Sequence, residues 1–141
     1  MAKEIITHSE QETFDWARTL GVRAQKGDVF ALYGGLGTGK TIIAKGLAKG
    51  LGIDEEITSP TFLMLEIYEG TLHLYHFDLY RINKKDELDE LNFEEYWEGQ
   101  GISIIEWAEN AWDRIPKKAV KIKLEWLGDN KRRIVIEYPD I

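Results

Sequence analysis

The chain has 141 residues, 43% of them hydrophobic and 30% charged, and its formal net charge is −7. This composition predicts a single globular domain over residues 1–141, without the basic stripe of a protein that grips nucleic acid by itself. There is no cysteine, so disulfides and thiolate chemistry are excluded. The acidic, polar start is unlike a signal peptide, and no apolar run approaches the roughly 18 residues of a membrane span. We therefore expect a cytoplasmic protein.

The first half of the chain predicts two strand–helix units. Residues 4–7 read as a short strand, and Ser9 then opens a helix with Glu12 in the capping-box position. Residues 29–33 (VFALY) form a continuous apolar run, which is typical of a buried parallel strand. After a glycine-rich stretch, residues 41–51 read as a helix that Gly50 and Gly52 would stop.

The second half adds hairpins and another buried strand. Residues 62–77 predict a hairpin with its turn at Glu69-Gly70, and residues 92–97 predict a short helix capped by Asn92. Residues 102–105 are a buried-strand candidate, and residues 120–138 predict a half-exposed hairpin at the edge of the fold. The fold class is therefore α/β, with a mixed, mainly parallel sheet flanked by helices and carrying antiparallel hairpins.

The stretch YGGLGTGKT contains a phosphate-binding motif. Gly34, Gly39, Lys40 and Thr41 satisfy the pattern GxxxxGK[ST], between a predicted buried strand and a predicted helix, as in P-loop nucleotide-binding proteins. Backbone N–H groups of such a loop point at phosphate oxygens, the lysine reaches the β- and γ-phosphates, and the threonine hydroxyl ligates Mg²⁺. The expected contacts to the nucleotide come from Gly35, Leu36, Gly37, Thr38, Gly39, Lys40, Thr41 and Ile42.

The string Asn83-Lys84-Lys85-Asp86 matches NKxD, the motif with which GTPases read guanine. In a GTPase this motif follows a late buried strand, whereas here it precedes the predicted strand at residues 102–105. No DxxG stands upstream of it. We interpret Asn83 as a helix cap and expect ATP rather than GTP.

Two predicted strands end in a carboxylate. Glu106 closes the apolar run GISII in the manner of a Walker B strand, and Asp78 closes LHLYHF. Either acid could hold Mg²⁺ or polarise the attacking water, although a lone acid after a strand is often only a cap. His73 and His76 are an odd distance apart on one strand, so we do not expect a two-histidine metal site. Thr61 is open to two interpretations, a contact to the γ-phosphate or a turn residue.

In chain order, the strings GGLGTGKT, SPTF, YHFDLYR and IIEW resemble the signatures of the TsaE (YjeE) family, the small bacterial ATPases of tRNA threonylcarbamoyladenosine synthesis. The resemblance covers nearly the whole chain. In that family the loop lysine and threonine bind phosphate and Mg²⁺, which implies these roles for Lys40 and Thr41. The glutamate of the EW pair helps to hold the metal, which implies Glu106 as a metal ligand. The aspartate of HFDLYR is required for function, which implies the same of Asp78.

The resemblance implies two further nucleotide contacts and one departure. An acidic residue that opens the first helix and a basic residue in the last hairpin approach the nucleotide, and Glu10 and Lys131 are the nearest matches. The second loop position is usually Asp or Asn in the family, whereas here it is Gly35. A side-chain contact from that position is therefore in doubt, while the backbone contacts are not.

The resemblance also implies partners. TsaE-like proteins bind a TsaB–TsaD pair, which modifies adenosine beside the anticodon of tRNAs that read ANN codons, and ATP hydrolysis resets that complex. Such a protein reaches tRNA only through its partners, which fits the acidic composition. Trp97, Trp107 and Trp112 are candidates for a docking surface or for the core. The alternatives are a small-molecule kinase, whose arginine-bearing lid is not evident here, and a nucleotide sensor that does not hydrolyse.

Overall fold

The computed structural model describes residues 2–34, 40–57, 65–80 and 93–139. Its elements in chain order are β1 (Ala2–Thr7), α1 (Glu10–Arg23), β2 (Val29–Tyr33), α2 (Lys40–Gly50), β3 (Leu65–Glu69), β4 (His73–Asp78), α4 (Phe93–Trp97), β5 (Ile102–Glu106), the 3₁₀ segment η1 (Ala108–Arg114), β6 (Val120–Gly128) and β7 (Lys131–Glu137). The strand and helix types predicted for these segments are confirmed. Asn92, the predicted cap of α4, lies outside the described residues.

The seven strands form one sheet in the order β1-β7-β6-β2-β5-β4-β3. The four central strands, β6, β2, β5 and β4, are mutually parallel. β7 and β3 pair antiparallel with β6 and β4, and β1 pairs antiparallel with β7. The mixed α/β sheet is therefore confirmed.

The position predicted for the last hairpin was wrong. Its first strand, β6, pairs in parallel with β2 in the middle of the sheet, and β1 covers its second strand, β7. Alternation of apolar and polar residues indicated one buried face and was consistent with an edge position. It does not reveal which strands lie on either side, and here both sides of the hairpin are occupied.

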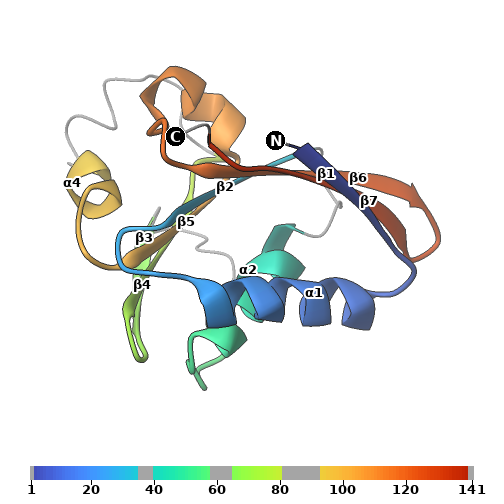
Figure 1. Ribbon diagram of the computed structural model, residues 1–141, viewed down its shortest axis with the longest axis horizontal. Helices are drawn as coiled ribbons and strands as arrows, with labels where there is room; N and C mark the ends of the chain where they lie inside the picture. Colours follow the sequence, from blue (N-terminus) through green and yellow to red (C-terminus); the bar gives the residue numbers. More distant parts are fainter. Residues whose placement is uncertain (1, 35–39, 58–64, 81–92, 140–141) are drawn as a thin grey trace.

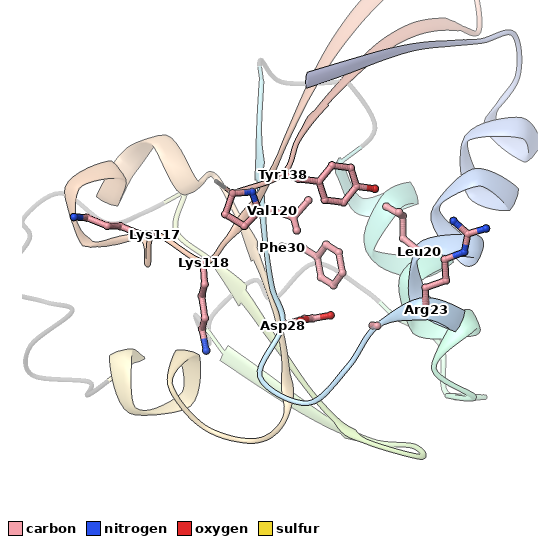
Figure 2. Close-up of a pocket in the computed structure, with 10 residues that line it drawn as sticks. Leu20, Arg23, Asp28, Phe30, Lys117, Lys118, Val120 and Tyr138 are labelled. Carbon is pink, nitrogen blue, oxygen red and sulfur yellow. The ribbon is translucent and has the colours of Figure 1, made fainter. Parts of the chain in front are cut away.

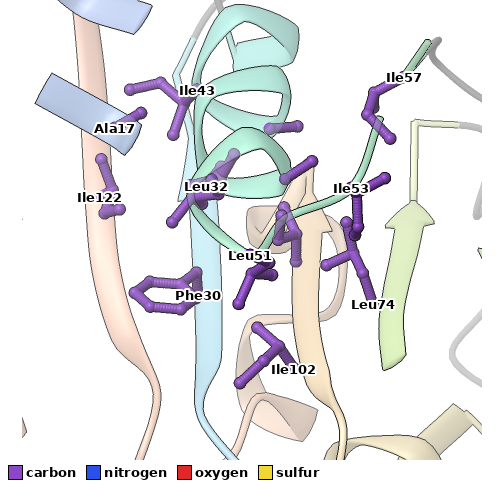
Figure 3. Packing of buried hydrophobic residues seen from close by; sticks show 14 of the residues in the cluster. Ala17, Phe30, Leu32, Ile43, Leu51, Ile53, Ile57, Leu74, Ile102 and Ile122 are labelled. Atoms are coloured by element: carbon purple, nitrogen blue, oxygen red, sulfur yellow. The ribbon is translucent and has the colours of Figure 1, made fainter. Parts of the chain in front are cut away.

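Helices cover both faces of the sheet (Figure 1). One face carries α1 and α2, and the opposite face carries α4 and η1. Figure 3 shows the larger apolar cluster, in which Leu32 of β2 lies close to Ile43 of α2, while Ile102 of β5 lies closer to Leu51, just after that helix. The second cluster, under α4 and η1, includes Phe77 and Trp97. Both faces of β2 and β5 are thus buried, as expected for parallel strands.

The position of α2 is fixed by close packing against α1. A Cβ at Gly46 would lie 2.5 Å from the carbonyl oxygen of Phe14, and one at Gly50 would lie 2.3 Å from that of Arg18. Gly50 was predicted to stop the helix, but it is the last residue of α2 and its main role is to admit the backbone of α1. Gly52, with φ +78°, makes the turn that follows. This contact sets where the first turn of α2 lies relative to the sheet.

The start of α1 follows the predicted capping pattern. The Ser9 hydroxyl oxygen accepts a hydrogen bond from the Glu12 backbone N–H at 3.0 Å. Two glutamates in the first turn, Glu10 and Glu12, complement the positive end of the helix. Beneath this turn, the Thr7 and Thr13 hydroxyls are 2.7 Å apart and tie α1 to the end of β1.

Candidate nucleotide-binding site

The candidate residues meet at one edge of the sheet because the strands that carry them are parallel. The carboxyl ends of β2, β5 and β4 lie side by side, and Asp78 is the direct register partner of Glu106. The first turn of α2, which contains Lys40 and Thr41, lies against the same strand ends, where Thr41 contacts Glu106. In sheets of this kind, ligands bind at the carboxyl ends of the strands.

Lys40 lies inside this site rather than in solvent. Its residue is 6% exposed, and its Nζ donates a hydrogen bond to the Gly34 carbonyl oxygen at 2.8 Å. The ammonium also lies 3.9 Å from the centre of the Trp107 ring, a cation–π contact. Burial lowers the pKa of Lys40, and the negative charges of Glu109, Glu106 and Asp78 oppose that shift. The lysine therefore lies beside Gly34 and close to three carboxylates.

The Glu106 carboxylate is held at both oxygens. Thr41 Oγ1 donates a hydrogen bond to Oε1 at 3.2 Å, and His76 Nε2 lies 2.5 Å from Oε2. Both Glu106 and His76 are buried. Because a carboxylate oxygen accepts, Nε2 is the nitrogen that carries the proton, while Nδ1 of His76 has no hydrogen-bond partner among the residues that the structure describes.

Sequence reasoning missed this role of His76. It considered His73 and His76 only as a metal-binding pair, whereas the structure places them in different environments, with His73 exposed and His76 fully buried. Among the residues that the structure describes, no group of three or more His, Asp and Glu side chains could hold a metal ion. The signal that could have identified His76 is its position two residues before Asp78, on the same face of β4.

Asp78 occupies a different environment from Glu106. Its carboxyl is half-buried and accepts a hydrogen bond from the Tyr80 backbone N–H at 2.9 Å. Burial raises the pKa of Asp78, the bond from Tyr80 opposes that shift, and the charge of Glu106 adds to it. The two carboxylates therefore face each other across neighbouring strands with different partners. Asp78 also ends a more exposed strand than Glu106 does, because β4 includes exposed and half-buried residues whereas every residue of β5 is buried.

The segment after β5 adds contacts that the sequence did not predict. Trp107 adopts a left-handed conformation (φ 60°, ψ 40°), which is rare for a bulky residue. Its ring packs on that of Tyr80, with the ring centres 4.9 Å apart. Two residues further on, Glu109 Oε2 accepts a hydrogen bond from the Gly34 backbone N–H at 3.2 Å. Asn110 Nδ2 donates to the Leu79 carbonyl oxygen at 2.8 Å.

The three tryptophans considered for docking have different environments. Trp97 is buried in the core, and Trp107 lies over Lys40 in the candidate site. Trp112 is exposed and contacts the ring of Tyr33 and the ammonium of Lys121. Core packing and a place in the site therefore account for the first two.

The structure describes both of the further residues that were expected at the nucleotide. Glu10 begins α1 and Lys131 begins β7, where its side chain is exposed. The basic residue beside Glu10 is instead Arg132, which is buried and whose Nη2 lies 3.9 Å from Glu10 Oε1. Ile42 lies in the first turn of α2. The site residues outside the described part of the chain are Gly35, Leu36, Gly37, Thr38 and Gly39, together with Thr61 and the string at 83–86.

A buried parallel strand that leads towards the glycine-rich sequence, a helix that begins at Lys40, and an acid-ended neighbouring strand define a P-loop NTPase-like protein. The family model described as "Threonylcarbamoyl adenosine biosynthesis protein TsaE" matches residues 7–134. The chain belongs to this TsaE family, whose role is in tRNA threonylcarbamoyladenosine biosynthesis.

Individual relatives agree over most of the chain. A tRNA threonylcarbamoyladenosine biosynthesis protein TsaE of Treponema pallidum is 41% identical over 131 residues, covering 93% of this chain and 97% of the relative. The protein of the same name in Bacillus subtilis is 40% identical over 129 residues, covering 91% and 80%. The crystal structure of Bacillus subtilis YdiB matches with a TM-score of 0.80 at 35% identity, covering 99% of this chain and 87% of that one. Among the described helices, none is long and apolar enough to cross a membrane.

Proposed function

We propose that this protein binds ATP with Mg²⁺ and hydrolyses it, as the ATPase subunit that supports threonylcarbamoyladenosine formation in tRNA. The observation that carries the proposal is the hydrogen bond between Thr41 Oγ1 and Glu106 Oε1, which joins the first turn of α2 to the end of a buried strand. A hydroxyl and a carboxylate oxygen, side by side at a helix N-terminus, are the donor set that a nucleotide-bound Mg²⁺ takes in P-loop proteins.

The residues present fit this ligand. Thr41 and Glu106 would hold the metal, which would neutralise charge on the phosphates, and Lys40 would supply a further positive charge beside them. The contact between His76 Nε2 and Glu106 Oε2 keeps the Glu106 carboxylate oriented towards Thr41. Asp78 lies on the adjacent strand end, where its carboxylate would orient the attacking water.

We propose different tasks for the two carboxylates. Removing the Glu106 carboxylate would leave the metal short of negative charge, so Glu106→Ala should weaken Mg²⁺-dependent ATP binding and turnover together. Asp78→Ala should keep most of the ATP affinity and lose turnover. Titrating both variants with ATP, with and without Mg²⁺, and then measuring hydrolysis separates the tasks. The opposite pattern would mean that the two assignments are exchanged.

The proposed partners are TsaB-like and TsaD-like proteins, with ATP hydrolysis resetting their complex and tRNA reached only through them. The net charge of −7 supports this indirect route, because a domain that binds RNA phosphates itself needs a basic surface. The test is release of phosphate from ATP by the purified chain, alone and with the two partner proteins from the same organism. Stimulation by the partners is the expected result. Phosphorylation of a small-molecule acceptor instead would identify a kinase and reject the proposal.

A further inference from the structure

The backbone turn that follows Asp78 is held both from β5 and from η1. The Leu79 backbone N–H donates a hydrogen bond to the Glu106 carbonyl oxygen at 3.0 Å, which extends the pairing of β4 with β5. From η1, Asn110 Nδ2 donates to the Leu79 carbonyl oxygen at 2.8 Å and, at 3.4 Å, to that of Tyr80. Leu79 is fully buried, so water cannot readily replace the contacts to its backbone.

One peptide group connects Asn110 to the Asp78 carboxylate. The peptide between Leu79 and Tyr80 is planar, so its C=O and its N–H point in opposite directions. The C=O accepts the hydrogen bond from Asn110 Nδ2, and the N–H donates to Asp78 Oδ1 at 2.9 Å. Holding the carbonyl therefore also fixes the direction of the N–H that binds the carboxylate. Hydrogen bonds in such a chain polarise and strengthen one another.

The Asn110 amide is itself well placed for this contact. Its nitrogen faces the turn, because the two neighbouring atoms are carbonyl oxygens, which only accept. Its backbone N–H donates to the Trp107 carbonyl oxygen at 3.0 Å in the first turn of η1. Trp107 directly follows Glu106 in the chain. Asn110 is therefore anchored to the end of β5 and fixes the Asp78 turn relative to the second carboxylate of the site.

We propose that Asn110 is a positioning residue for ATP hydrolysis, which acts through the Leu79–Tyr80 peptide to hold the Asp78 carboxylate in place. This inference rests on the proposed function, in which Asp78 orients the attacking water. Asp78 is half-buried at the end of its strand, so its carboxylate is free to turn towards solvent when this peptide is released. A misplacement of about 1 Å near the reacting atoms can lower a rate roughly 100-fold. Loss of Asn110 should therefore lower turnover, while the contacts that bind the nucleotide stay intact.

Asn110→Leu tests the proposal, because leucine has nearly the same shape as asparagine and lacks the N–H donors. The first measurement needs no nucleotide. In ¹⁵N-labelled protein, the Tyr80 amide proton should change its chemical shift and exchange with solvent roughly tenfold faster than in the parent. Asn110→Gln, which keeps the donor, should restore part of this protection. Gln100→Leu is the matched control, because it makes the same amide-to-leucine exchange at an exposed position before the other end of β5, and it should leave the Tyr80 amide unchanged.

A cleft at the opposite end of the sheet provides an internal reference. Figure 2 shows Leu20 of α1, Phe30 of β2 and Val120 of β6 around this cleft. Phe30 lies near the start of the strand whose other end leads to Gly34. The amide signals of the three cleft residues should keep their positions in Asn110→Leu. If they move, the substitution rearranges the fold as a whole and the positioning role is rejected.

The second measurement separates binding from turnover. With Mg²⁺ present, Asn110→Leu should bind ATP within about twofold of the parent. Its phosphate release, measured with the two partner proteins, should fall roughly ten- to hundredfold and recover in part in Asn110→Gln. The inference is overturned if the Tyr80 amide does not respond, or if ATP affinity and turnover fall by the same factor. A parent protein that hydrolyses no ATP would reject the proposed function instead, while the Tyr80 amide would still show whether Asn110 holds this turn.

Discussion

Replacing His76 by phenylalanine removes the proton donor that holds Glu106 Oε2. The two side chains are 0% and 3% exposed and 2.5 Å apart, so water cannot readily take the place of the histidine. Phenylalanine keeps an aromatic ring of similar size in the same position on β4. The substitution therefore acts mainly by leaving a buried carboxylate oxygen without its partner.

The size of the effect follows from this burial. An unsatisfied buried acceptor costs about 1–3 kcal/mol. Phenylalanine also removes Nδ1, which has no hydrogen-bond partner within the described part of the chain, and the loss of this nitrogen offsets part of that cost. We expect a net loss of about 1–2 kcal/mol, because the two effects oppose each other. For a chain of this length, that corresponds to a fall in Tm of roughly 3–8 °C.

Two measurements distinguish a positioning role from a merely structural one. Thermal unfolding followed by circular dichroism gives the stability loss, and titration with ATP in the presence and absence of Mg²⁺ gives the effect on the site. Loss of a group that orients a metal ligand lowers metal affinity about 10–100-fold. The Mg²⁺-dependent part of ATP binding should therefore weaken, and His76→Gln, which keeps an N–H donor, should restore part of it.

His73→Phe is the matched control, because it makes the same exchange at the exposed start of the same strand. It should change neither the Tm nor the Mg²⁺ dependence. If His76→Phe unfolds within a degree of the parent and binds Mg²⁺-ATP equally well, the His76–Glu106 contact does not position the carboxylate.

Four further outcomes are expected. Lys40→Ala should abolish tight ATP binding, measured with a fluorescent analogue, while circular dichroism shows an intact fold. Glu109→Gln should tighten ATP binding several-fold, because it removes a negative charge near Lys40 and the phosphates and keeps an acceptor for the Gly34 N–H; weaker binding would contradict this. Burial raises the pKa of Asp78, so its ionised form is disfavoured in the folded protein. The contribution of this group to stability is therefore present below its ordinary pKa and is lost as the pH rises through its raised pKa in the folded protein. Asp78→Asn should therefore be more stable than the parent at pH 7 and equally stable in acid, as chemical denaturation at several pH values would show. Competition for the same analogue should favour ATP over GTP, and a GTP preference that is lost in Asp86→Ala would overturn the assignment of adenine.

The parts of the site that the sequence predicted are those that depend on local pattern. The glycine-rich motif needs only a strand before it and a helix after it, and the acid-ended strands need only the rule that parallel strands end at a common edge. These two rules are enough to place Lys40, Thr41, Asp78 and Glu106 together from the sequence alone. All four residues do meet at that edge of the sheet.

The missed features depend on register and side-chain direction, which a single sequence does not fix. Arg132 lies beside Glu10, whereas Lys131, one residue earlier on β7, does not. A shift of one residue reverses the face of the sheet to which a strand side chain points. Likewise, Glu109 meets Gly34 only because η1 folds back over the end of β2, across 75 positions of the chain. The neighbours of β6 were mistaken for the same reason, since strand order is a long-range property.

The spacing of His76 and Asp78 has a structural cause that links these observations. Side chains two residues apart on a strand share a face, so both lie on the α2 side of β4, while Phe77 between them points into the core under α4 and η1. On the neighbouring strand, Glu106 is the register partner of Asp78, and its carboxylate reaches back to His76. Moving either residue by one position would exchange a functional group with an apolar one. The arrangement His-Phe-Asp on β4 therefore meets two demands at once, a polar site on one face of the sheet and an apolar core on the other.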